Sequence, residues 1–225
     1  MRICIDAGHN YEKFDTGATG NGLREQDVTF KIADYLKRML AQHGIEVTMT
    51  RAFLTDNVGT SASSSIKERA RLANTTRCDY FVSIHCNAGG GTGTETLIYG
   101  TGGQAEGMAE LVNNAIVKRL GLKDRGVKVR PGLGVLRLTD MPAILVETAF
   151  IDNKNDSLLL KNGQKAFAEA IRDGILSFLG IKEPDFTEIV KGVMEKTGLE
   201  QKTMDYLLEY EYGRELVKKL FDAMK

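Results

Sequence analysis

Short apolar segments that resemble strands alternate with amphipathic segments that resemble helices along residues 1–180, and this alternation constrains the fold more than any other feature. The strand-like segments are residues 2–6, 45–49, 80–85, 94–99 and 143–147. The helix-like segments are residues 26–43, 66–77, 104–120 and 163–179, and glycine follows most of them. This alternation predicts an α/β fold with a mixed, mostly parallel sheet covered by helices on both faces.

The composition changes at Gly180, after which no strand-like segment occurs. We therefore expect two domains, 1–180 and 181–225, of which the second is a small helical appendage. The run from Asp185 to Glu188 resembles a capping box for a helix near 186–197, Thr203 is expected to cap a second helix, and 214–224 reads as a third. The appendage either packs on the first domain, mediates oligomer contacts or targets the protein to its substrate. Three tyrosines would form either a binding face or part of its core: Tyr206, Tyr210 and Tyr212.

Charge and hydropathy exclude some classes of protein. The formal net charge is zero, which argues against a nucleic-acid-binding protein. The chain holds no apolar run long enough to span a membrane, and its first strand begins almost at Met1, so we expect neither membrane insertion nor a signal peptide. The three cysteines form no CxxC pair and are interpreted as buried free thiols.

Four residues with metal-binding or acid–base chemistry lie near one predicted edge of the sheet. His9 and His85 lie at the ends of two strand-like segments, Glu147 ends a third, and Glu25 begins the first long helix. The carboxyl ends of parallel strands form the usual binding edge of an open α/β sheet, so we expect these side chains to converge. The third histidine, His43, precedes Gly44 and is interpreted as a residue at a helix end.

Two histidines and one carboxylate form the ligand set of a catalytic zinc site, where a second carboxylate can transfer protons. Taken singly, each residue also has a structural explanation. A histidine at a strand end is often only hydrogen-bonded, Glu25 suits the positive end of a helix, and Glu147 could pair with an arginine. The convergence of all four favours the metal site.

Several separated motifs occur in an order typical of one enzyme family: ICIDAGHN, GNGLREQDVTFKIADYLKRML, DYFVSIHCNA and GVLRLTDMPAILVETAFIDN. With them, residues 1–180 resemble the zinc-dependent N-acetylmuramoyl-L-alanine amidases of type 3, which include phage endolysins and bacterial autolysins. The resemblance implies that His9, Glu25 and His85 bind one Zn²⁺ ion and that Glu147 is the catalytic acid/base. It also implies that Asn87 shapes the site or holds a ligand, so that Asn87 and Arg137 are the candidate substrate-binding residues. Many family members carry a second glycine where this chain has Asn10.

The implied activity is hydrolysis of the amide between N-acetylmuramic acid and L-alanine in peptidoglycan, which would lyse the cell wall. Arg137, with Arg130 and Lys128, could hold carboxylates of the stem peptide, or these residues could be solvated surface charges. Two alternatives remain: a zinc peptidase that cuts within the stem, and a non-catalytic wall-binding module. Without a leader, we expect synthesis in the cytoplasm and action on the wall after holin release or host-cell lysis.

Overall fold

The computed structural model describes residues 1–182, 186–210 and 213–224. The chain divides into two compact units, Met1–Leu179 and Gly180–Lys225, each with its own buried core. The first unit contains every strand found among these described residues and all four of the expected chemistry-bearing residues.

A six-stranded sheet forms the centre of the first unit, in the order β4-β1-β5-β8-β6-β7. Its strands are β1 (Arg2–Ala7), β4 (Glu46–Met49), β5 (Tyr80–Asn87), β6 (Thr94–Ile98), β7 (Asp124–Val129) and β8 (Ala143–Phe150). All neighbouring strands are parallel except β6 and β8, which are antiparallel. A separate hairpin pairs β2 (Thr19–Gly20) with β3 (Leu23–Arg24).

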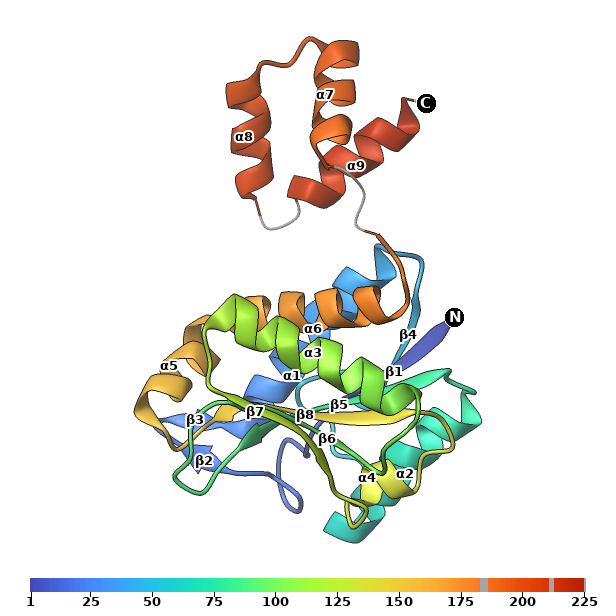
Figure 1. The fold of residues 1–225 in the computed structure, drawn as a ribbon, viewed down its shortest axis with the longest axis vertical. Coiled ribbons are helices and arrows are strands. Elements are labelled where there is room, and N and C mark those ends of the chain that lie inside the picture. Colours follow the sequence, from blue (N-terminus) through green and yellow to red (C-terminus); the bar gives the residue numbers. More distant parts are fainter. Residues whose placement is uncertain (183–185, 211–212, 225) are drawn as a thin grey trace. The chain divides into compact units, whose positions relative to one another are not determined.

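Helices cover both faces of this sheet (Figure 1), because the central strands are apolar on both sides. One face carries α1 (Glu25–Ala41), α3 (Gln104–Leu120) and α6 (Gln164–Phe178), and the other carries α2 (Ala62–Thr75) and α4 (Gly134–Arg137). A further helix, α5 (Lys154–Asn162), follows β8. The mixed, mostly parallel α/β sheet expected from the sequence is confirmed. Among the described residues, no helix has both the length and the apolarity needed to cross a bilayer.

Several elements differ from the sequence-based expectation. The strand β7 was not expected, since its sequence DRGVKV is charged and mostly half-exposed at the edge of the sheet. The short helices α4 and α5 and the β2–β3 hairpin were also not expected. Helix α2 begins earlier than predicted, at Ala62, because Ser61 and Ser64 form a reciprocal capping box.

The second unit contains three helices within its described residues, α7 (Phe186–Thr197), α8 (Gln201–Glu209) and α9 (Gly213–Ala223). Val193, Met204 and Val217 are fully buried and form its core. The prediction that Thr203 caps the second helix was wrong, because Glu200 holds the N-cap position and the backbone N–H of Thr203 donates to it. The predicted cap at Asp185 and the third tyrosine, Tyr212, lie outside the described residues.

Candidate metal and catalytic site

A glycine-containing loop after β1 brings the first two site residues together. His9 adopts a left-handed backbone conformation with φ 70° directly after Gly8, and the loop returns through Gly17 to the start of α1. A Cβ at Gly17 would lie 2.7 Å from Cδ2 of His9 and 2.8 Å from Oε2 of Glu25. A Cβ at Gly8 would lie 2.6 Å from the ring of His85. Both glycines are therefore needed for the close approach of the site residues.

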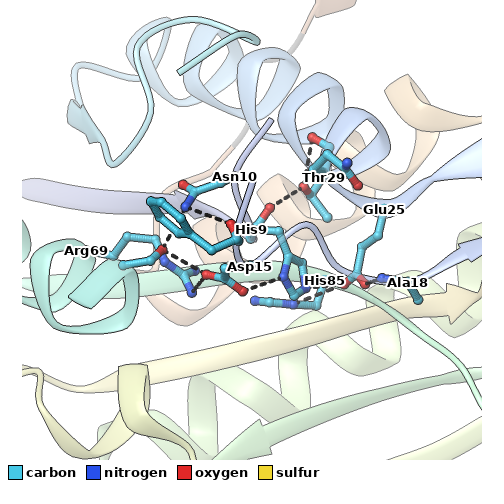
Figure 2. Close-up of polar contacts among 12 residues, drawn as sticks. His9, Asn10, Asp15, Ala18, Glu25, Thr29, Arg69 and His85 are labelled. Atoms are coloured by element: carbon cyan, nitrogen blue, oxygen red, sulfur yellow. Dashed lines mark hydrogen bonds and ion pairs between the residues drawn. The ribbon is translucent and has the colours of Figure 1, made fainter. Parts of the chain in front are cut away.

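His9, Glu25 and His85 face one another, as expected from the sequence. Their nearest ligand atoms all lie within 4.8 Å of one another. Oε1 of Glu25 lies 3.0 Å from Nε2 of His9 and 3.1 Å from Nδ1 of His85. The two imidazole rings meet edge to face, with centroids 4.7 Å apart. Figure 2 shows the three side chains converging from the loop after β1, from α1 and from β5.

Glu25 is almost fully buried and both of its oxygens accept backbone hydrogen bonds. The N–H of Ala18 donates to Oε2 at 2.8 Å, and the N–H of Cys86 donates to Oε1 at 2.9 Å. Burial alone would raise the pKa of this carboxyl, but hydrogen bonds to His85 and His9 outweigh it and lower the pKa well below its usual value. Glu25 is therefore an ionised carboxylate fixed at the start of a helix, in a form that can bind a metal ion.

A buried network positions His9 from its other side (Figure 2). Nδ1 of His9 lies 2.9 Å from Oδ1 of Asp15. Asp15 in turn accepts from Ser65 at 2.8 Å and from Arg69 at 3.4 Å, and Arg69 also donates to the fully buried Asp6 at 2.8 Å. Burial would lower the pKa of His9, yet the bonds to Asp15 and Glu25 raise it to about 9. A carboxylate behind a ligating histidine is a common feature of metal sites.

Asn10 supports the same loop at the position where many family members have glycine. The side chain is fully buried, and its Oδ1 accepts from the N–H of Val58 at 2.8 Å. Its Nδ2 donates to the carbonyls of Phe14 and Val58. Asn10 therefore ties the loop after β1 to the segment that precedes α2.

Glu147 lies on β8 directly opposite His85 of β5 in the parallel register. Its Oε2 is buried and has no hydrogen-bond partner among the described residues. Burial, followed by the negative charges of Glu25 and Glu95, raises the pKa of Glu147 to about 8. A buried carboxyl with a pKa near neutrality beside a metal-binding cluster is suited to proton transfer.

The proposed substrate-binding residues have different surroundings. Asn87 follows His85 on β5, and its Nδ2 donates to Oε1 of Glu95 at 3.2 Å. Arg137 is exposed at the end of α4, and among the described residues no polar contact joins it to the four site residues. Lys128 lies in β7. Arg130 follows β7 at the opposite end of the sheet from Glu147, because β6 and β7 run antiparallel to β8.

The donor set fits a metal ion. Two imidazoles and one ionised carboxylate are ligands that divalent zinc favours, each at about 2.0–2.2 Å. The separations of 3.0 and 3.1 Å between Oε1 of Glu25 and the two ring nitrogens are of the size expected for ligands that share one ion. Oε2 of Glu147 is also buried without a hydrogen-bond partner in the described part of the chain. Orphaned polar atoms of this kind indicate a missing partner.

Sequence reasoning missed Asp15, Arg69 and Glu95, whose contacts connect separate segments of the chain. Only the burial of charged groups in the folded structure identifies them. No sequence pattern predicts the contact between Arg69 of α2 and Asp6 of β1, because it depends on how the helix crosses the sheet.

Comparisons with known proteins agree with this geometry. The N-acetylmuramoyl-L-alanine amidase family (Amidase_3) matches residues 3–177. The N-acetylmuramoyl-L-alanine amidase CwlM of Bacillus licheniformis is 39% identical over 175 residues, which are 77% of this chain and 65% of that protein. The endolysin of Bacillus phage SPP1 is 37% identical over 192 residues, which are 80% of this chain and 67% of the endolysin.

A solved structure gives the same result. The N-acetylmuramoyl-L-alanine amidase from Clostridium difficile 630 superposes with a TM-score of 0.71 at 33% identity, covering 81% of this chain and 98% of that one. The family match extends over nearly all of the first unit, which contains the whole candidate site. The chain therefore belongs to the N-acetylmuramoyl-L-alanine amidase family.

Proposed function

We propose that this chain hydrolyses the amide bond between N-acetylmuramic acid and L-alanine in bacterial peptidoglycan, with one Zn²⁺ ion as its cofactor. The observation that carries the proposal is the grouping of His9, Glu25 and His85 within 4.8 Å, beside the buried and unpartnered carboxyl oxygen of Glu147. Membership of the amidase family supports the choice of bond.

His9, Glu25 and His85 would hold the ion, which would leave one position of a tetrahedral site open for water or substrate. When bound, zinc polarises a carbonyl oxygen and lowers the pKa of a water molecule to about 7. Thiolate ligands are not part of the proposal. Cys86 is buried, and this burial is the main reason why the pKa of its thiol lies well above the usual value.

Glu147 would move the protons of the reaction. Its carboxylate accepts a proton from the water that attacks the amide carbonyl, and a C–O bond forms. It then donates that proton to the nitrogen of L-alanine as the C–N bond breaks. A cation at His9, Glu25 and His85 would lower the raised pKa of Glu147, so metal binding favours the ionised form that accepts the proton.

The test is the release of new amino groups from purified peptidoglycan by the metal-stripped protein, with and without added zinc. We expect zinc to restore the activity and L-alanine to be the new N-terminus. Glu147→Gln keeps the side-chain shape and is expected to lower the rate by about 10²–10⁴-fold. The matched control is Glu110→Gln, which changes an exposed glutamate of α3 and is expected to leave the rate unchanged.

The outcomes separate this proposal from its alternatives. A new N-terminus other than L-alanine would identify a peptidase that cuts within the stem. Sedimentation with the wall without any amine release would identify a non-catalytic binding module. Wall cleavage by Glu147→Gln at the parent rate would overturn the role of Glu147.

A further inference from the structure

A second cluster of charged side chains lies beside Glu147, and the proposed chemistry does not use it. Glu95 of β6 is 6% exposed, and two cations from β7 share its Oε2. Nε of Arg125 donates at 2.6 Å and Nζ of Lys128 at 2.5 Å. The other oxygen of Glu95 accepts from Asn87. We call these four residues, Asn87, Glu95, Arg125 and Lys128, the Glu95 cluster.

The sheet register makes this cluster a direct neighbour of the proposed catalytic residue. Glu95 is paired with Glu147 across the antiparallel strands β6 and β8. Residues that are directly opposite in such a pair share one face of the sheet, with Cβ atoms about 4.5–5.5 Å apart. His85, Glu147 and Glu95 therefore follow one another across three adjacent strands.

The cluster carries an excess of positive charge, with two cations and one carboxylate. Burial would raise the pKa of Glu95, but Lys128 and Arg125 outweigh it and lower the pKa, so the carboxylate remains ionised. Arg125 and Lys128 are 27% and 30% exposed, whereas the Glu95 side chain is 8% exposed. The negative charge is therefore covered, and the cationic groups face the solvent.

Arg125 is held in a fixed orientation. Its guanidinium lies over the ring of Phe150 at 4.9 Å, and Glu95 binds its Nε. Within the described part of the chain, no hydrogen bond occupies its two terminal nitrogens. When a guanidinium is bound at Nε and stacked on a ring, its two terminal nitrogens remain as coplanar donors. Their spacing matches the two oxygens of a carboxylate.

We propose that Arg125, oriented by Glu95 and Phe150 and assisted by the charge of Lys128, binds a carboxylate of the stem peptide beside the bond that is cut. The inference rests on the proposed amidase function, and the carboxylate closest in the chain to the L-alanine amide is the free α-carboxylate of the D-glutamate that follows it. Arg125 is then a substrate-specificity residue, and Glu95 and Phe150 are its positioning residues.

The test uses the zinc-loaded full chain and two soluble muropeptides that differ in one group. The first has the D-glutamate α-carboxylate, and the second has a carboxamide there. We expect kcat/KM for the carboxylate form to be higher by about tenfold or more, the size expected of a charge-assisted hydrogen bond. Arg125→Gln is expected to remove this preference through a higher KM for the first muropeptide, with the second cleaved as before.

The second muropeptide distinguishes binding from a structural effect. If Arg125 only supports the sheet, Arg125→Gln lowers kcat/KM for both muropeptides equally, and the proposal fails. The matched control is Arg130→Gln, which removes an exposed cation beyond the other end of β7 and should keep the preference. If Arg125→Gln does not fold, two measurements still test the subsite. They are the preference of the parent chain and that of Lys128→Gln for the carboxylate muropeptide over the carboxamide muropeptide.

Failure of the subsite and failure of the amidase function give different results. Equal cleavage of both muropeptides by the parent chain would overturn the subsite and leave the amidase function intact. If neither muropeptide loses its L-alanine peptide in the presence of zinc, the amidase function itself is wrong and the subsite falls with it.

Discussion

At the scale of single residues, Asp15 orients His9 through the ring nitrogen that faces away from Glu25. Asp15→Asn removes the charge and keeps the size. Zinc affinity should fall by about 10–100-fold, the usual effect of losing a carboxylate behind a ligating histidine. Competition with a chromophoric chelator measures it. Asp34→Asn, on the exposed side of α1, is the control and should bind zinc like the parent. Equal affinity in all three proteins would show that Asp15 has no part in orienting the ligand.

A second residue-scale prediction concerns Glu147 in the metal-free protein, where its pKa is raised to about 8. An unfolded chain releases this proton near pH ~4.3, whereas the folded chain keeps it up to about pH 8. Across that range the folded state binds more protons, so the free energy of unfolding falls as the pH rises. Glu147→Gln removes this dependence, so its Tm relative to the parent should increase between about pH 5 and pH 8.

Thermal unfolding in the presence of a chelator checks this expectation. Glu110→Gln changes an exposed carboxyl and should follow the parent at every pH. A constant difference in Tm between Glu147→Gln and the parent would mean that Glu147 titrates like an ordinary carboxyl.

At the scale of elements, the loop that leads into α1 offers two glycines with nearly equal backbone angles. Gly17 has φ +75° and Gly22 has φ +77°. Alanine at either position should cost about 1 kcal/mol or more of stability, because left-handed backbone is unfavourable with a Cβ. A Cβ at Gly17 also collides with His9 and Glu25, whereas nothing lies within 4 Å of one at Gly22.

Gly17→Ala should therefore lose zinc affinity, while Gly22→Ala should keep it despite a similar loss of stability. Chemical denaturation gives the stability of each variant, and chelator competition gives its affinity. If both variants bind zinc like the parent, the loop adjusts more freely than the structure indicates.

Elements with a clear apolar period were predictable from the sequence, and those without one were not. The helix predicted over 104–120 forms over those residues, because its apolar positions repeat at helical spacing and Gly121 ends it in a left-handed conformation. Strand β7 has charged residues and lies at the edge of the sheet, where only β6 pairs with it and α3 packs against it. Helix α5 is short and polar, so its packing against β8 rather than its sequence pattern determines it.

The grouping of His9, Glu25 and His85 was predictable from the sequence, whereas the residues that support them were not. His9, Glu25 and His85 are rare or well-placed residues at strand and helix ends, so their convergence follows from topology. Arg125 has no such signal. Its importance arises from the antiparallel pairing of β6 with β8, which brings the start of β7 toward Glu147, and the sequence does not specify that direction.

At the scale of the whole molecule, the second unit has a core of its own and two exposed tyrosines, Tyr206 and Tyr210, that are 60% and 56% exposed. We predict that residues 1–179 alone cleave a soluble muropeptide as fast as the full chain. We also predict that they sediment less with insoluble wall, because aromatic faces are suited to amphipathic ligands. Co-sedimentation and kinetics on both proteins measure this. Equal sedimentation would contradict wall targeting, and sedimentation equilibrium of the full chain would then test an oligomer contact.

Strand β6 runs antiparallel to β8, and the residues on the two sides of this reversal come from different stretches of the chain. The three metal-binding candidates all come from residues 9–85, whereas the Glu95 cluster and its aromatic support come from residues 87–150. An exchange of residues 87–150 between homologues would therefore change the preference for the stem peptide and leave the three metal-binding candidates unaltered. The fold in this sense separates inheritance of the metal ligands from inheritance of peptide selectivity, while Glu147 is inherited with the later stretch.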